Sequence, residues 1–84
     1  MNIHEFARAH KHFFWSTRNY DGLNNEAVVE ATLNYGDMDD IKELIAILGM
    51  KETARIFREQ TSRARTNYQA NVAHYFKLYF QKYA

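Results

Sequence analysis

The sequence predicts an all-α fold, a compact bundle of four or five short helices in a single domain over residues 1–84. The chain has no proline and only three glycines, so few residues interrupt helices. Its apolar residues recur at spacings of three and four rather than in alternation, which is the periodicity of an amphipathic helix. A chain of 84 residues has room for one small core.

The composition narrows the class of protein. Hydrophobic residues make up 46% and charged residues 25% of the chain, as in globular domains. No apolar run approaches the roughly 20 residues of a membrane helix, and the opening NIHEFARAHKH lacks the apolar segment of a signal peptide. There is no cysteine, so disulfides and thiolate metal ligands are excluded. We expect a soluble cytoplasmic protein that does not associate with membranes.

Two helices are expected in the first part of the chain. The first covers about residues 2–14, where apolar and aromatic side chains repeat every three or four positions. The second covers residues 26–35, with Asn24 or Asn25 as its N-cap and Gly36 as its C-terminal stop.

Two more helices and a loop follow. Asp37 begins the third helix, and Asp40 three residues later completes an acidic variant of the capping box. Gly49 ends this helix. The fourth covers about residues 51–60, and the polar, basic segment 61–69 is expected to be a loop.

The last helix begins at Tyr68 or Asn71 and extends to about residue 83. Five of its aromatic residues fall within an arc of about 140° on a helical projection, which is the width of a core-facing side. They are Tyr75, Phe76, Tyr79, Phe80 and Tyr83. We expect this stripe to pack mainly as core on the two central hairpins, while Phe13, Phe14 and Trp15 anchor the other end of the core.

Tyrosine hydroxyls at the edges of this stripe need water or a partner, so we expect the edges to be half-exposed. Tyrosine-rich faces that are partly hydrated are common at protein interfaces. Tyr75, Tyr79 and Tyr83 are therefore the candidate partner-binding residues.

Charge is divided between the two halves of the chain. Residues 1–50 carry a net charge of −4 and residues 51–84 a net charge of +5. Such a division is typical of a nucleic-acid-binding face, but it equally suits halves that attract each other within one bundle or a head-to-tail dimer.

Residues 40–60 have the outline of a helix-turn-helix, with Gly49 in the turn. The register is degenerate, because Ile45 stands where a small residue is usual and Arg55 where an apolar one is usual. The alternative is a plain helical hairpin with a solvated basic face. Five basic residues of this segment and the following loop are the candidate nucleic-acid-binding residues: Lys51, Arg55, Arg58, Arg63 and Arg65.

No segment has the spacing of a catalytic, cofactor or metal site. His10 and His12 point about 200° apart on a helix, and neither has a carboxylate three or four residues later. His4 and His74 lie at opposite ends of the chain. Nucleophile elbows and phosphate-binding loops are missing from the sequence. We therefore expect no catalytic residue, no cofactor and no bound metal.

Three segments together resemble a family of small uncharacterised bacterial proteins: Phe14-Trp15, then LNYGDMDDIKELIAILGMKETARIF, then the closing aromatic helix HYFKLYF. The similarity spans about residues 12–80. Members of that family look like partners of nucleotidyltransferase-type toxins in toxin–antitoxin or abortive-infection loci. The resemblance implies an interaction protein without catalytic residues, and a toxin as its partner.

The leading functional hypothesis is thus a non-enzymatic protein-interaction module, antitoxin-like in the sense of the resemblance. The alternative is a DNA-binding regulator that uses the degenerate helix-turn-helix as a homodimer. A third hypothesis is a subunit of a larger enzyme.

Overall fold

The computed structural model describes residues 2–14 and 22–84, whose regular elements are all helices, with no strand among them. The all-α prediction is confirmed. The elements in chain order are α1 (Ile3–Ala9), the 3₁₀ helix η1 (Lys11–Phe13), α2 (Asn25–Tyr35), α3 (Met38–Leu48), α4 (Met50–Thr61) and α5 (Ala70–Tyr83).

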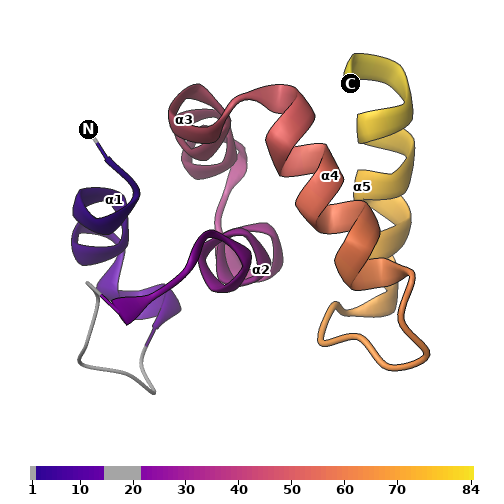
Figure 1. Ribbon diagram of the computed structural model, residues 1–84, viewed down its shortest axis with the longest axis horizontal. Coiled ribbons are helices and arrows are strands. Elements are labelled where there is room, and N and C mark those ends of the chain that lie inside the picture. Colours follow the sequence, from indigo (N-terminus) through magenta and orange to yellow (C-terminus); the bar gives the residue numbers. More distant parts are fainter. Residues whose placement is uncertain (1, 15–21) are drawn as a thin grey trace.

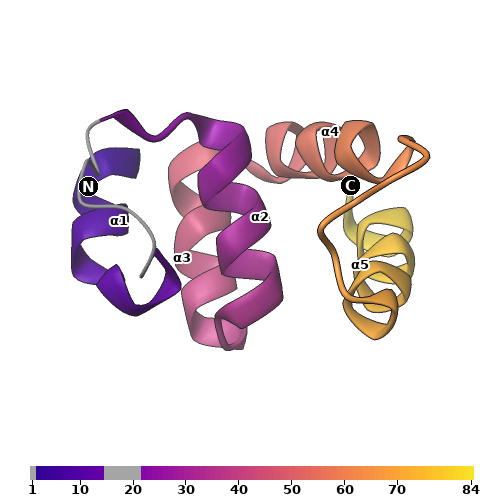
Figure 2. The same cartoon turned by 90° about the horizontal axis from the view of Figure 1, so that it is seen from below.

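The helices are arranged in a row, with α1 at one end and α5 at the other (Figure 1). In the middle, α2 and α3 lie side by side, and α4 packs against both (Figure 2). α1 contacts α2 and α3, whereas α5 packs mainly against α4. The molecule measures 31 × 26 × 19 Å. Within the described part of the chain, no helix combines the length and the apolarity that a membrane span requires.

The predicted N-caps of the central helices are confirmed. The side chain of Asn24 accepts a hydrogen bond from the amide of Ala27 at 2.8 Å, at the start of α2. Asp37 and Asp40 form the reciprocal capping box at the start of α3, with bonds of 2.9 and 3.1 Å. These side chains satisfy amides that a helix leaves unpaired in its first turn.

The prediction of one continuous helix over residues 2–14 is wrong. α1 ends at Ala9, and His10 adopts φ −119° and ψ 46°, outside the helical region. Its side chain bonds back to the carbonyl of Phe6 at 2.9 Å, and η1 follows with a tighter turn. This break lets Phe13 and Phe14 enter the core, where they are 4% and 5% exposed. Trp15, expected beside them, lies outside the described residues.

Two glycines end helices for different reasons. Gly36 has an ordinary φ of −80°, but a Cβ there would lie 2.7 Å from the carbonyl oxygen of Thr32 and 3.2 Å from the ring of Phe13. Close packing of α2 on η1 therefore requires glycine. Gly49 has φ +92°, in the region that favours glycine, and it alone joins α3 to α4. The turn of a helix-turn-helix usually has three or four residues, so this one-residue connection is shorter than that motif requires.

α5 packs differently from the prediction. It lies mainly on α4 rather than across two hairpins. The contact centres on Phe57, whose ring lies 5.2 Å from that of Tyr68, 6.2 Å from that of Phe76 and 5.3 Å from that of Phe80, measured between centroids. All four side chains are at most 6% exposed. Phe57 is thus the residue that holds α5 on the rest of the molecule.

We predict that Phe57→Ala lowers the free energy of unfolding by about 3–5 kcal/mol, because it removes a buried ring and leaves a cavity between α4 and α5. Urea unfolding followed by circular dichroism measures this. Tyr35→Ala is the matched control, since Tyr35 is 60% exposed, and its effect should stay within about 0.5 kcal/mol. Equal losses in the two variants would contradict the central role of Phe57.

Candidate functional site

The outer side of α5 carries an exposed row of large side chains, which we call the outer tyrosine face: Tyr75, Leu78, Tyr79 and Tyr83. Tyr75, Leu78 and Tyr83 are 49%, 53% and 55% exposed. Tyr75, Tyr79 and Tyr83 follow one another at intervals of four, and Leu78 comes three after Tyr75, so these residues share one broad side of the helix. Together with Lys82 they line a shallow groove of about 240 Å³.

The rings of this face are already arranged against one another. Tyr75 stacks on Tyr79 with centroids 6.2 Å apart, and Tyr79 lies 4.9 Å from Tyr83. Burial raises the pKa of the Tyr79 hydroxyl, and the neighbouring hydroxyls of Tyr75 and Tyr83 raise it further. The Lys82 ammonium lies 5.3 Å from the centre of the Tyr83 ring. Mutual packing limits how much side-chain freedom a partner would have to restrict.

The predicted aromatic stripe is divided by the packing of α5. Phe76 and Phe80 point toward α4 and are 4% and 0% exposed, whereas Tyr75 and Tyr83 are about half-exposed. The expectation of half-exposed edges is confirmed, but the outward side is wider than predicted because α4 is the main helix covering α5. Leu78, which the projection set apart from the stripe, joins the exposed side.

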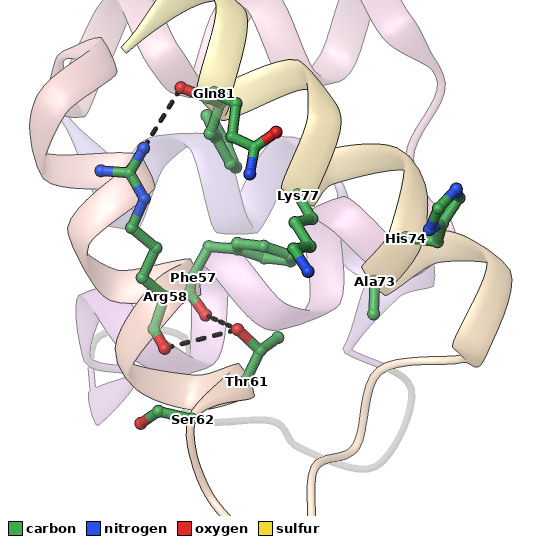
Figure 3. A pocket seen from close by; sticks show the side chains of 9 residues that line it. Phe57, Arg58, Thr61, Ser62, Ala73, His74, Lys77 and Gln81 are labelled. Carbon is green, nitrogen blue, oxygen red and sulfur yellow. Dashed lines mark hydrogen bonds between the residues drawn. The ribbon is translucent and has the colours of Figure 1, made fainter.

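A second groove, of about 410 Å³, lies between α4 and α5 (Figure 3). Phe57, Ala73 and Phe80 give it an apolar wall. Arg58, His74 and Lys77 contribute basic or ionisable groups, and none of the described lining residues is acidic. The guanidinium of Arg58 also donates a 3.2 Å hydrogen bond to the carbonyl of Phe80, near the C-terminal end of α5. This groove suits an acidic group attached to an apolar one.

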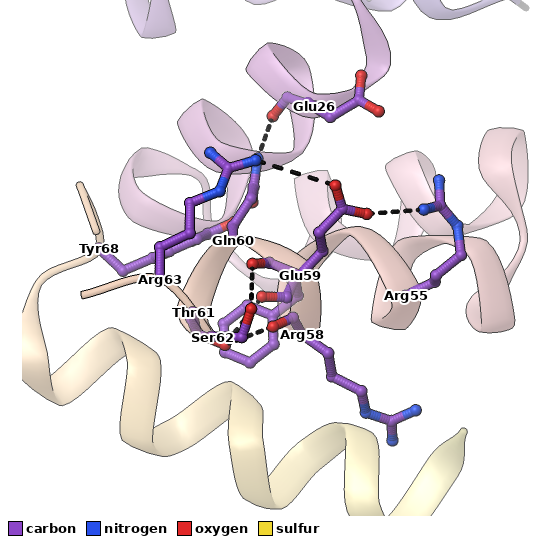
Figure 4. A network of polar contacts seen from close by, with 10 residues as sticks. Glu26, Arg55, Arg58, Glu59, Gln60, Thr61, Ser62, Arg63 and Tyr68 are labelled. Carbon is purple, nitrogen blue, oxygen red and sulfur yellow. Dashed lines mark hydrogen bonds and ion pairs between the residues drawn. The ribbon is translucent and has the colours of Figure 1, made fainter. Parts of the chain in front are cut away.

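Three of the five candidate nucleic-acid-binding residues have partners inside the protein. The guanidinium of Arg55 is bonded to Glu52 and, at 3.0 Å, to Glu59, which also lies 3.9 Å from Arg63 (Figure 4). The bond to Glu52 raises the pKa of Arg55, and the same bond lowers the pKa of Glu52. Arg58 is engaged with α5.

Lys51 and Arg65 are exposed, and no ion pair of theirs is found within the described residues. The five basic residues therefore do not act as one free cationic surface, since two carboxylates lie among them and would repel phosphate. DNA binding stays a prediction from the sequence.

A buried hydrogen-bond network that the sequence did not indicate joins α4 to α2 and to the loop before α5. Gln60 is 5% exposed and donates from Nε2 to the carbonyl of Glu26 at 2.9 Å. The hydroxyl of Tyr68 donates to Gln60 Oε1 at 2.6 Å. The segment predicted as a polar loop thus contains Tyr68, which is only 6% exposed. A glutamine on a helix and a tyrosine in a polar segment carry no signal of this pairing.

One group of side chains has the composition of a metal site. His10, Asp40 and Glu43 bring one ligand atom each within 4.8 Å of one another. His10 Nε2 lies 3.0 Å from Asp40 Oδ1 and 3.9 Å from Glu43 Oε2. Carboxylates close to each histidine along the chain gave no sign of this group. Asp40 lies 30 residues from His10, and only the packing of α1 on α3 brings them together.

The pKa of Asp40 reflects this environment. Partial burial acts to raise it, but the hydrogen bond from the Asp37 amide and the bond and charge of His10 outweigh burial, so the pKa lies below its ordinary value.

Comparison with protein-family models, with characterised proteins and with solved structures found no match to this chain. The family resemblance and the toxin partner that it implies stay predictions.

We predict that Tyr68→Phe lowers the free energy of unfolding by about 1–3 kcal/mol, because Gln60 Oε1 would be left buried without a donor. Chemical denaturation at neutral pH measures the loss. Tyr35→Phe is the matched control. The Tyr35 hydroxyl is on an exposed side chain and can hydrogen-bond to water, so its loss should change the free energy of unfolding by less than about 0.5 kcal/mol.

Burial also raises the pKa of the Tyr68 hydroxyl, with a smaller contribution from Glu30. The folded protein therefore keeps this proton when the unfolded chain loses it above about pH 10, and stability should fall as the pH rises beyond that point. We expect this fall to be shallower in Tyr68→Phe. The free energy of unfolding of the unmodified protein and of Tyr68→Phe is measured between about pH 9.5 and 11. Equal slopes against pH would show that the Tyr68 hydroxyl is not the group responsible.

Proposed function

We propose that the protein is a non-enzymatic interaction module that binds a partner protein on the outer tyrosine face. The observation that supports this most is the row of half-exposed large side chains on one helix, Tyr75, Leu78 and Tyr83, around the partly buried Tyr79. Contiguous exposed apolar surface on a small domain is typical of an interaction site. Tyrosine is also enriched among the residues that dominate binding energy at interfaces.

The charge around this face favours an acidic partner. Lys82 lines the groove of this face, and α5 contains no aspartate or glutamate. A helix that presents apolar side chains at spacings of three and four, flanked by carboxylates, would match both the groove and Lys82. We therefore propose an acidic amphipathic helix of another protein as the occupant.

A second copy of the chain suits this face less well. Two α5 helices packed through this face would bring the Lys82 side chains of the two copies together. The acidic half of another copy has the right charge but little apolar surface to offer. Outside α5, the only large hydrophobic side chain exposed among the described residues is Tyr35.

The sequence resemblance names a class of partner, a nucleotidyltransferase-type toxin, and an antitoxin-like role is compatible with binding through α5. The proposal itself rests on the face and its charge.

Selection of helical peptides from a displayed random library against the purified protein tests the proposal. We expect the enriched peptides to be acidic, with apolar residues at positions i, i+3, i+4 and i+7. Calorimetric titration should then give a dissociation constant that increases about tenfold or more in Tyr83→Ala, a change of about 1.4 kcal/mol. Tyr35→Ala is the matched control, since it removes an equally exposed tyrosine from another helix, and it should leave the constant unchanged.

Two results would overturn the proposal. One is enrichment of basic peptides, or of peptides whose affinity is indifferent to Tyr75→Ala and Tyr83→Ala. The other is sedimentation equilibrium that shows a dimer broken by Tyr83→Ala, which would assign the face to a second copy of the chain.

A further inference from the structure

We propose that His10, Asp40 and Glu43 bind a divalent transition-metal ion between the end of α1 and the first half of α3. This site lies at the opposite end of the row of helices from α5 (Figure 1), so it is independent of the proposed protein-binding face.

The two distances from His10 to the carboxylates are close to those of a metal site, and all three ligand atoms lie within 4.8 Å of one another. In a tetrahedral site with bonds of about 2.0–2.1 Å, ligand atoms lie about 3.4 Å from one another. His10 Nε2 lies 3.0 Å from the nearer Asp40 oxygen and 3.9 Å from the nearer Glu43 oxygen, which brackets this value. The Glu43 side chain is 42% exposed, so it has room to rotate toward the other two ligands.

Two of the three ligands are already oriented by other groups. His10 Nδ1 lies 2.9 Å from the carbonyl oxygen of Phe6, which can only accept, so Nδ1 carries a proton and Nε2 faces the carboxylates. Asp40 uses Oδ2 to accept from the Asp37 amide, which leaves Oδ1 directed at His10. In metal sites, ligating histidines and carboxylates are commonly held in this way by a carbonyl or an amide.

With its proton on Nδ1, the imidazole directs Nε2 toward the two carboxylates, which is the orientation of a metal ligand. The side chains of His10 and Asp40 are only 12% and 22% exposed, whereas that of Glu43 is 42% exposed. Water therefore has access from the Glu43 side, where it would fill a remaining coordination position.

The ligand set selects the class of ion. One imidazole with two carboxylates suits Zn²⁺, Co²⁺, Mn²⁺ or Fe²⁺, whereas Mg²⁺ and Ca²⁺ prefer oxygen ligands alone. Zn²⁺ should bind more tightly than Mn²⁺ because affinities follow the general order for first-row ions. A bound ion would tie α1 to α3 and stabilise the folded protein by mass action.

Calorimetric titration of the tag-free protein with Zn²⁺, and separately with Mg²⁺, tests the proposal. We expect one Zn²⁺ per chain, no saturable binding of Mg²⁺, and a higher melting temperature with Zn²⁺. His10→Gln and Glu43→Gln should each weaken Zn²⁺ binding by about tenfold or more. Two matched controls, His12→Gln and Asp39→Asn, change an exposed neighbour of each kind of ligand and should leave the affinity within about threefold.

A second measurement uses only the unmodified protein, so it tests the site even if a variant folds poorly. Zn²⁺ added to the unmodified protein should shift the NMR signals of the His10 ring and leave those of His74 unchanged. The proposal is overturned if Zn²⁺ does not saturate a single site or if His10→Gln binds it as tightly as the unmodified protein does. The three side chains then serve only the packing of α1 on α3. Peptide binding at α5 is measured separately, so failure of one proposal does not imply failure of the other.

Discussion

The structure depends on the packing of Phe57 between α4 and the C-terminal helix. Its ring contacts Tyr68, Phe76 and Phe80, and these contacts carry most of the attachment of α5, since α4 is the main helix that α5 touches. The Gln60 network lies one turn away and ties the same part of α4 to α2 and to Tyr68. Apolar and polar contacts of α4 thus converge on one short region, and every buried polar side-chain atom among the described residues has a hydrogen-bond partner.

Attachment through a single neighbour explains the exposed surface of α5. A helix at the centre of a bundle is covered on several sides, but one at the end of a row buries only the side that faces its neighbour. Phe76 and Phe80 fill that side, so the remaining large residues face water. Keeping Tyr75, Leu78 and Tyr83 exposed carries a cost in solubility. A partner that covers them would remove this cost, which is the physical basis of the proposed interaction.

The acidic and basic halves of the chain have different roles in this arrangement. On α4, Arg55 pairs with Glu52 and Glu59, and Glu59 also lies near Arg63 in the following loop, whereas α5 contains two lysines and no acidic residue. In the first half, Asp40 has two partners, since its side chain accepts from the Asp37 amide in the capping box of α3 and faces His10 across the contact with α1. One carboxylate therefore links helix initiation, the docking of α1 and the proposed metal site.

Local patterns in the sequence determined the all-α class, the capping box of Asp37 and Asp40, the stop at Gly49 and the approximate bounds of the helices after residue 24, because each depends on interactions within a few residues. The same patterns placed five aromatic residues on one broad side of the last helix, but which of them face outward depends on how many helices cover it, and only the tertiary structure decided that. Three further features could not be predicted from the sequence: the break at His10, the Gln60–Tyr68 hydrogen bond and the contact of His10 with Asp40. Each joins residues through packing or across long stretches of chain, and periodicity carries no information about such contacts.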